Sequence, residues 1–333
     1  MYPFPSINQF RHMCKEAGYV FPGSPKPIVT FRGTVKLHGT NAAIAFRGMK
    51  HGKVDITFQS RNNVITPEND NAGFARCMTE EVGFVNLEKL ARSNFIINEN
   101  QTTIIYGEWC GEGIQKGVAL TQLPKMFVIF GVKQIQWNGD EFWYDILDFD
   151  FVNSLKDEEH KIYNSAQFPN WEIEIDLEKP TLKVNDMVAL TEAVEAECPV
   201  GKHFGVSGIG EGIVWRCKEN PTSKLWFKVK GEKHSVSKVK KLVEVDLEKV
   251  QSINEFIDRV VTEPRVLQGI DYLKEQGKEL TRKSTGDFLS WFFADVMKEE
   301  SDVLEASGLT KKDISSELGK KARVLFFKEI DFS

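Results

Sequence analysis

At residues 28–48 the chain reads IVTFRGTVKLHGTNAAIAFRG. Valine, isoleucine, phenylalanine and threonine recur in both halves of this stretch and glycines bound them, which is typical of short strands joined by a turn. Lys36 ends the first predicted strand, and a turn at Gly39 with the short polar residues Thr40 and Asn41 follows at once. This placement favours a lysine in the wall of a pocket, although a lysine near a glycine is more often a solvated turn residue.

The same β-rich texture continues to about residue 241. Runs rich in branched and aromatic residues, bounded by Gly, Asn and Pro, occupy residues 53–62, 102–111, 125–137, 210–219 and 224–233. Two predicted helical stretches, 72–92 and 186–197, interrupt them. Strands mixed with helices, without regular βαβ alternation, predict an α+β domain built on antiparallel sheets. Residues 1–28 are proline-rich and lack periodicity, so we interpret them as a leader draped over that domain.

The texture changes after Lys241, where apolar residues begin to recur at helical spacing. The candidate N-caps in this region are Asp246, Thr281 and Thr310, and the candidate helix breakers are Gly277, Gly308 and Gly319. We therefore predict two domains, an α+β domain over residues 1–243 and a small all-helical domain over residues 244–333.

Composition excludes several classes of protein. Of 333 residues, 41% are hydrophobic and 27% charged, as in ordinary globular domains, and the net charge of −5 excludes a general polycation. The five cysteines are scattered with no CxxC pair, which indicates neither a zinc site nor a disulfide framework. The amino-terminal residues do not resemble a signal peptide, and no apolar run approaches about 20 residues. We expect the protein to act in a reducing cytosol, without a membrane and without a protein partner. A viral or phage origin is compatible with this expectation.

Three further segments place charged groups beside apolar strands. Glu108 stands in YGEW at the end of one predicted strand, and Glu211 stands among glycines in GIGEGIV. In LWFKVK, alternation places Lys228 and Lys230 on one face of a strand and Phe227 and Val229 on the other. Each group alone has an ordinary interpretation as a surface charge. Their order along the chain, lysine, carboxylate, carboxylate and paired lysines, is not explained in that way.

This ordered set resembles the superfamily of ATP-dependent ligases and messenger-RNA capping enzymes. KLHGTN resembles its KxxG nucleotidyl-lysine motif, and the later elements are similar to SRN at 60–62, YGEWCGEGIQKGV at 106–118, FVIF at 127–130, EGIV at 211–214 and FKVK at 227–230. GEGIQKG and the helical tail look most like the phage RNA ligase 2 and kinetoplastid RNA-editing ligase branch. The resemblance implies an antiparallel-sheet, ATP-grasp-like ligase domain followed by a small helical domain.

The resemblance also implies a role for individual residues. Lys36 would be the nucleophile that accepts AMP, and Lys228 and Lys230 would contact the α-phosphate. The remaining nucleotide site would comprise Val35, His38, Asn41, Arg61, Glu108, Phe130 and Glu211. Among these, Phe130 would stack on adenine, and Glu211 and Glu108 would hold a divalent metal. Gln115 would belong to the strand-joining steps, with Ser60 at a position that engages RNA.

The sequence departs from that branch at two positions. Thr34 stands where the branch has an arginine, and Ser60 where it usually has a lysine. Both positions serve the later, RNA-engaging steps in such enzymes. The sequence therefore supports transfer of AMP to the lysine better than it supports the complete joining reaction. The last ~90 residues resemble that branch only in their helical character.

The chemistry requires a neutral lysine amine, whereas a free lysine titrates near 10.4. We expect burial and neighbouring cations to disfavour the ammonium. The cofactors implied are ATP, as the donor of AMP, and Mg²⁺ or Mn²⁺. Residues 224–241 hold seven lysines and one acidic residue, and we expect Lys238, Lys240 and Lys241 to bind RNA phosphates. A solvated basic linker is the alternative.

The function predicted is ATP-dependent joining of RNA 3′-hydroxyl and 5′-phosphate ends, with a nicked duplex as the expected substrate. One rival is a DNA ligase or a capping guanylyltransferase, in which an OB-fold would replace the helical tail. Another rival is a relative that keeps the pocket for binding and has lost the chemistry. The sequence leaves open a broken transfer RNA or an RNA–DNA hybrid as the natural substrate.

Overall fold

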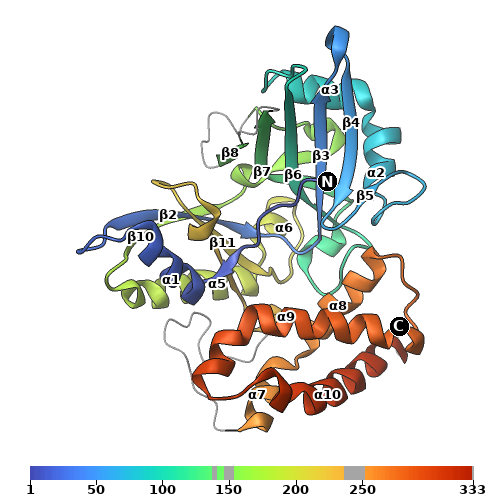
Figure 1. Ribbon diagram of the computed structural model, residues 1–333. Coiled ribbons are helices and arrows are strands. Elements are labelled where there is room, and N and C mark those ends of the chain that lie inside the picture. Colours follow the sequence, from blue (N-terminus) through green and yellow to red (C-terminus); the bar gives the residue numbers. More distant parts are fainter. Residues whose placement is uncertain (137–140, 146–153, 236–251, 332–333) are drawn as a thin grey trace. The chain divides into compact units, whose positions relative to one another are not determined.

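The computed structural model describes residues 1–136, 141–145, 154–235 and 252–331 (Figure 1). The chain divides into two compact units, which we describe separately. The first comprises Met1–Asn8 and His12–Val229, and the second comprises Gln9–Arg11 and Lys230–Ser333. The predicted boundary between residues 243 and 244 lies outside the described residues, so it stays a prediction.

A five-stranded sheet contains the strand that ends at Lys36. Its strands, in spatial order, are β1 (Asn8–Gln9), β12 (Phe227–Lys230), β11 (Gly212–Cys217), β2 (Ile28–Lys36) and β10 (Asn170–Asp176). β2 pairs antiparallel with both β10 and β11. Gly33 is required in β2, because a Cβ atom there would lie 2.7 Å from the ring of Trp215. This close approach lets a buried tryptophan lie across the middle of the sheet.

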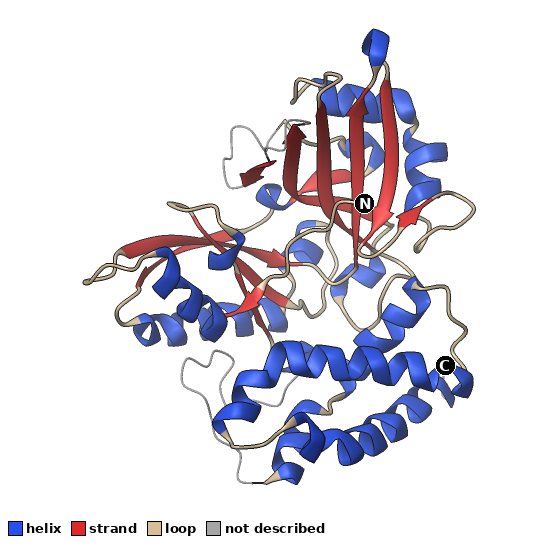
Figure 2. Ribbon diagram, viewed as in Figure 1, coloured by secondary structure: helices blue, strands red, loops and turns tan. Residues whose placement is uncertain are grey.

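A seven-stranded sheet forms the rest of the β structure (Figure 2). Its strands are β5 (Val64–Ile65), β4 (Val54–Ser60), β3 (Thr40–Gly48), β6 (Gln101–Cys110), β7 (Met126–Gln136) and β8 (Glu141–Asp145), with β9 (Ile162–Asn164) paired to β7. The β7–β9 pairing is parallel, and the five other pairings in this sheet are antiparallel. The prediction of an α+β fold is confirmed.

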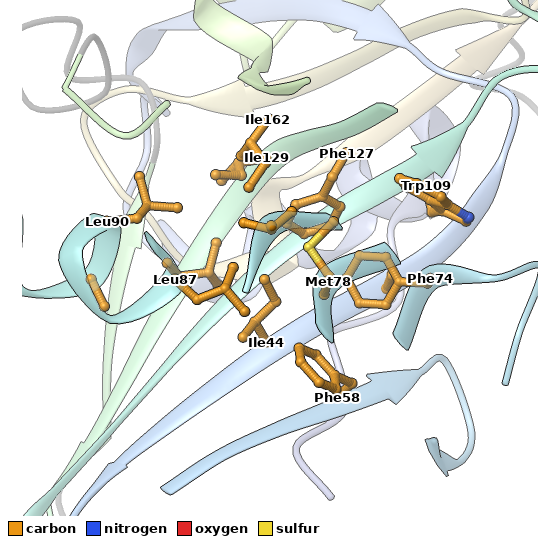
Figure 3. Packing of buried hydrophobic residues seen from close by; sticks show 14 of the residues in the cluster. Ile44, Phe58, Phe74, Met78, Leu87, Leu90, Trp109, Phe127, Ile129 and Ile162 are labelled. Atoms are coloured by element: carbon orange, nitrogen blue, oxygen red, sulfur yellow. The ribbon is translucent and has the colours of Figure 1, made fainter. Parts of the chain in front are cut away.

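Helices pack against one face of the seven-stranded sheet. They are α2 (Phe74–Arg76), the π-helical segment η2 (Cys77–Val82) and α3 (Phe84–Arg92). Phe74 is fully buried in this core, with ring centroids 5.5 Å from Trp109 and 5.0 Å from Phe127 (Figure 3). The predicted helix over 72–92 is therefore present but broken, because Gly83 adopts φ +79° between η2 and α3.

The remaining helices of this unit are α5 (Val184–Ala196) and α6 (Pro199–His203), and α5 confirms the helix predicted at 186–197. Short 3-10 turns connect the elements at Lys50–Gly52, Ala119–Gln122, Glu158–His160, Ser165–Gln167, Pro180–Lys183, Ser223–Leu225 and Glu232–His234. None of the described helices is long and apolar enough to cross a membrane.

The interpretation of residues 1–28 as a leader that lacks periodicity is wrong. Helix α1 spans Phe10–Val20, and it buries Phe10, Met13 and Ala17. These positions follow the i, i+3, i+7 spacing of an amphipathic helix. This helical signal is only 11 residues long and is flanked by prolines, which favour a loop.

The described part of residues 252–331 is helical. It contains α7 (Ile253–Val260), α8 (Glu263–Glu275), η9 (Arg282–Ser284), α9 (Thr285–Ala306) and α10 (Lys311–Asp331), packed around stacked Phe288 and Phe326 rings 4.2 Å apart. Gly277 and Gly308, at φ +65° and +71°, end helices as predicted. The prediction for Gly319 is wrong, since it lies inside α10, where a Cβ atom would lie 3.8 Å from Phe293.

The predicted N-caps had mixed outcomes. The side chain of Thr281 accepts a hydrogen bond from the Lys283 amide at the start of η9. Thr310 directly precedes α10, and its hydroxyl and amide both donate to Asp313. Asp246 lies outside the described residues.

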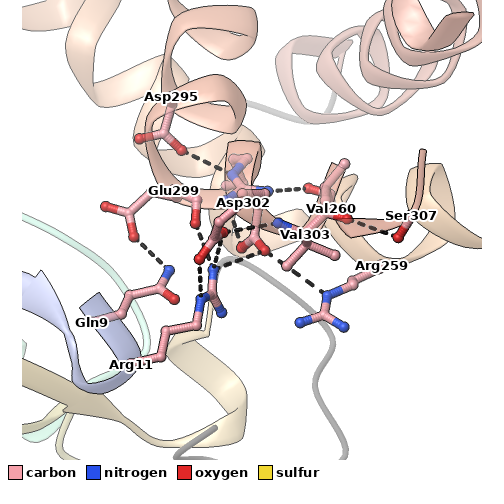
Figure 4. Close-up of polar contacts among 11 residues, drawn as sticks. Gln9, Arg11, Arg259, Val260, Asp295, Glu299, Asp302, Val303 and Ser307 are labelled. Carbon is pink, nitrogen blue, oxygen red and sulfur yellow. Dashed lines mark hydrogen bonds and ion pairs between the residues drawn. The ribbon is translucent and has the colours of Figure 1, made fainter. Parts of the chain in front are cut away.

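Three arginines converge on Glu300, a fully buried carboxylate in the second unit. Figure 4 shows two of them, Arg11 and Arg259. Arg11 Nη2 lies 3.3 Å from Glu300 Oε2, and Arg259 and Arg265 lie 3.9 and 3.8 Å from the same carboxylate. Arg265 also pairs with Asp295 at 2.9 Å. Opposite charges and hydrogen bonds thus offset the cost of burying these groups.

Candidate active site

Lys36 and Glu211 form the centre of the site. β2 ends at Lys36, and the antiparallel register places Gly212 directly opposite it on β11. Glu211 therefore lies next to that pair, and Lys36 Nζ donates to Glu211 Oε2 at 2.8 Å. The carboxylate is 3% exposed and the lysine side chain 21%. The two predicted residues, 175 positions apart, thus meet in a largely buried contact.

The backbone before Glu211 is held on several sides. The carbonyl of Gly208 accepts from the Cys198 amide at 2.8 Å, and the carbonyl of Ile209 accepts from the Ala119 amide at 3.0 Å. Gly210 donates to the Val194 carbonyl at 3.1 Å, and a Cβ atom on Gly210 would lie 2.6 Å from that oxygen. Glycine is needed here because α5 approaches so closely, and the fixed backbone orients Glu211.

Glu108 is fixed by the turn that follows Lys36. Asn41 on β3 lies opposite Glu108 on β6, and the Gly39 amide donates to Glu108 Oε1 at 3.0 Å. A Cβ atom on Gly39 would lie 2.3 Å from the Trp109 carbonyl oxygen, so the turn excludes any larger residue. Gln115 Nε2 donates to the Gly39 carbonyl at 3.2 Å. The turn is therefore held from both sides.

The two carboxylates determine the electrostatics of Lys36. Burial lowers the pKa of Lys36, but the charges of Glu211 and Glu108 outweigh it, so the pKa is raised above its ordinary value. Arg61 acts in the opposite direction. The pKa of Glu108 is also raised, chiefly by burial. Two acidic neighbours thus outweigh burial and Arg61 in this structure, and the expectation that Lys228, Lys230 and bound Mg²⁺ lower the pKa of Lys36 stays a prediction.

His38 contacts the same carboxylate oxygen as Lys36, with Nδ1 3.3 Å from Glu211 Oε2. The structure therefore brings together Lys36, His38, Glu108 and Glu211 as predicted, with Asn41 on the adjoining strand. Val35 is buried in β2 opposite Ile213. Arg61 is exposed in the turn after β4, close enough to influence Lys36.

Ser60 and Phe130 are less exposed than Arg61. Ser60 is fully buried, and its Oγ accepts from the Asn63 amide at 3.2 Å. Phe130 is half-buried, with its ring edge-on to Phe4 at 4.9 Å. Contact of Ser60 with RNA and stacking of Phe130 on a base stay predictions.

Sequence reasoning missed an arginine and an aromatic residue beside Phe130. Arg216 Nη1 donates to the Phe130 carbonyl at 2.7 Å, and its guanidinium carbon lies 4.6 Å from the Trp226 ring and 5.9 Å from the Phe4 ring. Phe4 also stacks on Trp226 at 5.6 Å. The available signals were an aromatic residue between two prolines, Pro3 and Pro5, and a cation directly after the run Ile213–Trp215.

The predicted alternation in β12 is confirmed. Phe227 and Val229 are buried, whereas Lys228 and Lys230 are half-exposed. The predicted RNA contacts Lys238, Lys240 and Lys241 lie outside the described residues. Within the described part of the chain, no group of three His, Cys, Asp or Glu side chains is arranged for a metal ion.

Comparisons with known proteins give a family match. A family model described as RNA ligase matches residues 29–230. Similar solved structures include a variant of the Naegleria gruberi RNA ligase with ATP and Mn, at 16% identity and a TM-score of 0.44, covering 70% of this chain and 56% of that one. The same ligase with PPi gives 17% identity and a TM-score of 0.42, with coverage of 70% and 56%. This chain thus spans 56% of the length of that ligase. No curated protein matches the chain.

Proposed function

The chain belongs to the RNA ligase family, and on that premise we propose that it joins RNA ends with ATP by carrying AMP on Lys36. The observation that carries this proposal is the contact between Lys36 and Glu211 in a largely buried site. A lysine held at the end of a strand, with two carboxylates and a glycine turn around it, is suited to nucleophilic attack on a phosphate.

In the first step, Lys36 Nζ attacks the α-phosphorus of ATP. A nitrogen–phosphorus bond forms, the bond to pyrophosphate breaks, and Nζ loses a proton. Attack requires the neutral amine, whereas Glu211 and Glu108 favour the ammonium. Separation of Lys36 from Glu211 would lower the pKa of Lys36, because burial and Arg61 both favour the neutral form. Glu211 would thus hold the nucleophile in place until substrate binds.

Glu211 and Glu108 fit a divalent cation. Mg²⁺ is commonly held by one or two carboxylates together with substrate phosphates and water, so a cluster of three protein ligands is not needed. Glu211 is buried, and the pKa of Glu108 is raised chiefly by burial and to a smaller extent by the charge of Glu211, so a cation would stabilise both carboxylates. When bound, the cation would offset charge on the phosphates.

The other predicted residues complete the proposed nucleotide site. Lys228 and Lys230 would contact the α-phosphate, and Phe130 would offer a flat face to adenine. Val35, His38, Asn41 and Arg61 would border the nucleotide and its phosphates. Gln115 and Ser60 would serve the RNA-joining steps, and Lys238, Lys240 and Lys241 would bind RNA phosphates.

The later steps regenerate the lysine. An oxygen of the RNA 5′-phosphate attacks the AMP phosphorus and displaces Lys36. The 3′-hydroxyl of the other end then attacks the 5′-phosphate, forms the phosphodiester bond and releases AMP. We propose that residues 1–243 perform the first step and that residues 244–333 help to hold RNA, in agreement with the phage RNA ligase 2 and kinetoplastid branch.

A labelling experiment tests the proposal. The protein is incubated with α-labelled ATP and Mg²⁺ and then resolved on a denaturing gel. We expect an acid-stable, hydroxylamine-sensitive label that is lost in Lys36→Ala. Label retained in that variant would contradict the assignment of Lys36, and preferential labelling by GTP would favour a capping enzyme. A wild-type protein that binds ATP without becoming labelled would be a binding relative.

A further inference from the structure

Asn71 lies beside the turn that follows Lys36, and none of the proposed reaction steps involves it. Its Nδ2 donates to the hydroxyl oxygen of Thr40 at 2.9 Å. Thr40 is the first residue of β3 and directly follows Gly39, whose amide binds Glu108. Both side chains are partly exposed, so a substrate in the site could reach the Thr40 hydroxyl.

The position of Asn71 is fixed by its neighbours. Asp70 Oδ1 accepts from the amides of Asn71 and Ala75 at 2.7 and 2.8 Å, and Asp70 Oδ2 accepts from the Arg76 amide at 2.8 Å. The next residue, Ala72, has φ +55°, an unusual value for a residue with a side chain. Backbone of this kind persists only where its surroundings enforce it.

The carbonyl of Ala72 provides that enforcement. It accepts from Trp109 Nε1 at 3.1 Å and from Lys125 Nζ at 2.8 Å. Trp109 lies opposite Thr40 in the β3–β6 pairing and directly follows Glu108. The segment that carries Asn71 is therefore tied to the same strand ends that carry the candidate site.

The hydrogen bond fixes the polarity of the Thr40 hydroxyl. A hydroxyl has one hydrogen to donate and can accept through its oxygen. Because Thr40 Oγ1 accepts from Asn71, its hydrogen is available to another acceptor, and no described residue accepts it. An oxygen of an anionic substrate is the acceptor that suits a hydroxyl four residues from the nucleophile.

We propose that Asn71 is a positioning residue that keeps the Thr40 hydroxyl as a donor to a phosphate oxygen of the substrate. This inference rests on the proposed ligase function and adds to it. The phosphate could belong to ATP in the first step or to RNA in the later steps. The two sources share one chemistry, and separate assays of the steps distinguish them.

Three substitutions test the polarity itself. Asn71→Ala removes the donor and leaves the hydroxyl free to rotate. Asn71→Asp introduces an acceptor of similar size, which turns the hydroxyl hydrogen toward residue 71 and away from substrate. Thr40→Val removes the hydroxyl. We expect Asn71→Asp and Thr40→Val to slow the affected step by about tenfold or more, and Asn71→Ala to slow it less.

Two assays are run on each full-length variant: lysyl-AMP formation from ATP, and sealing of RNA that is already adenylylated. Slowing of the first identifies ATP as the source of the phosphate, and slowing of the second alone identifies RNA. Thermal unfolding is measured in parallel, and Thr40→Ser, which keeps the hydroxyl, should retain activity. If Asn71 had a purely structural role, the activity of each variant would fall in proportion to its loss of thermal stability. Asn71→Asp would then not be less active than Asn71→Ala.

A double-mutant cycle completes the test. In a Thr40→Val background, Asn71→Asp should have no further effect, because no hydroxyl remains to be turned. An additive effect in this cycle, or equal activity of Asn71→Asp and Asn71→Ala, would overturn the inference. The proposed function would still hold in that case if the wild-type protein forms lysyl-AMP. A wild-type protein that neither becomes labelled nor seals RNA would overturn both.

Discussion

The Lys36 ammonium and the Glu211 carboxylate form an ion pair with a separation of 2.8 Å between Nζ and Oε2. The same oxygen lies 3.3 Å from His38 Nδ1, so one buried carboxylate contacts both Lys36 and His38. This arrangement stores the nucleophile in its protonated form, since Glu211 and Glu108 raise the pKa of Lys36 against the effect of burial.

The raised pKa predicts slow modification of Lys36 by amine reagents. At a fixed alkaline pH, a raised pKa leaves a smaller fraction of neutral amine, so Lys36 should react slowly. Glu211→Gln removes the main charge that raises this pKa, and modification of Lys36 should become faster. Mass spectrometry of the protein after timed labelling measures both rates. No change in Glu211→Gln would contradict the role given to the ion pair.

Substitution of Gly210 should impair lysyl-AMP formation. A Cβ atom there would lie 2.6 Å from the Val194 carbonyl oxygen, so Gly210→Ala must shift the backbone that orients Glu211. We expect about a tenfold or greater loss of labelling, equivalent to about 1.4 kcal/mol in the barrier. The matched control is Gly286→Ala in α9, where nothing lies within 4 Å and labelling should be unchanged. Normal labelling of Gly210→Ala would show that the orientation of Glu211 does not depend on the close contact between Gly210 and α5.

Lys228 and Lys230 should behave differently from the lysines that follow them. If they contact the α-phosphate, alanine at either position should slow lysyl-AMP formation by about tenfold or more, because a contact to a charged group contributes about 1.5–3 kcal/mol. Alanine at Lys238, Lys240 and Lys241 should weaken RNA binding, reduce its salt dependence and spare labelling. Filter binding at several salt concentrations and labelling of each variant measure these effects. Small effects confined to RNA binding in all five variants would place the phosphate site elsewhere.

Loss of Arg11 should destabilise the second unit. Arg11→Met removes the nearest of three guanidinium groups around the buried Glu300, and also a 2.7 Å bond to the Glu299 carbonyl. Arg259 and Arg265 remain 3.9 and 3.8 Å from the carboxylate, so we expect a cost of about 1–3 kcal/mol. Urea unfolding measures it. The control, Lys320→Met in α10, breaks an exposed pair with Glu317 and should have little effect.

The same contact sharpens the prediction that residues 1–243 fold alone and accept AMP. Residues Gln9–Arg11 are grouped with the second unit, so truncation removes the acceptors of Arg11. Arg11→Met should therefore be nearly neutral for stability in the truncated protein, unlike in the full chain. A folded truncated protein that cannot be labelled by ATP would contradict the proposed division of labour.

The strands could be predicted from sequence because their signals are local. Branched and aromatic residues bounded by glycine located β2, β3 and β7 to within about two residues. Gly319 was misjudged because its interior position in α10 depends on packing near Phe293, which no local pattern records. Helix α1 carries a local signal in the spacing of Phe10, Met13 and Ala17, but the prolines on either side of it favour a loop.

The site was predictable only in part. Motif order and resemblance identified Lys36, Glu108 and Glu211, whereas their contact arises from the pairing of β2 with β11 across 175 residues. The direction of the pKa shift of Lys36 depends on which charges lie nearest, and a sequence does not specify that. The bond from Asn71 to Thr40 was equally hidden, because it joins a loop residue to a strand end 31 residues earlier.

The contact between Arg11 and Glu300 also bears on how the chain is made, because 289 residues separate its partners. Translation at about 5–20 residues per second makes Arg11 roughly 15–60 s before Glu300. During that interval the guanidinium of the nascent chain must stay in water, without the carboxylate that later surrounds it. The second unit can therefore be completed only after the segment that carries Glu300 has been synthesised, long after Arg11 itself has been made.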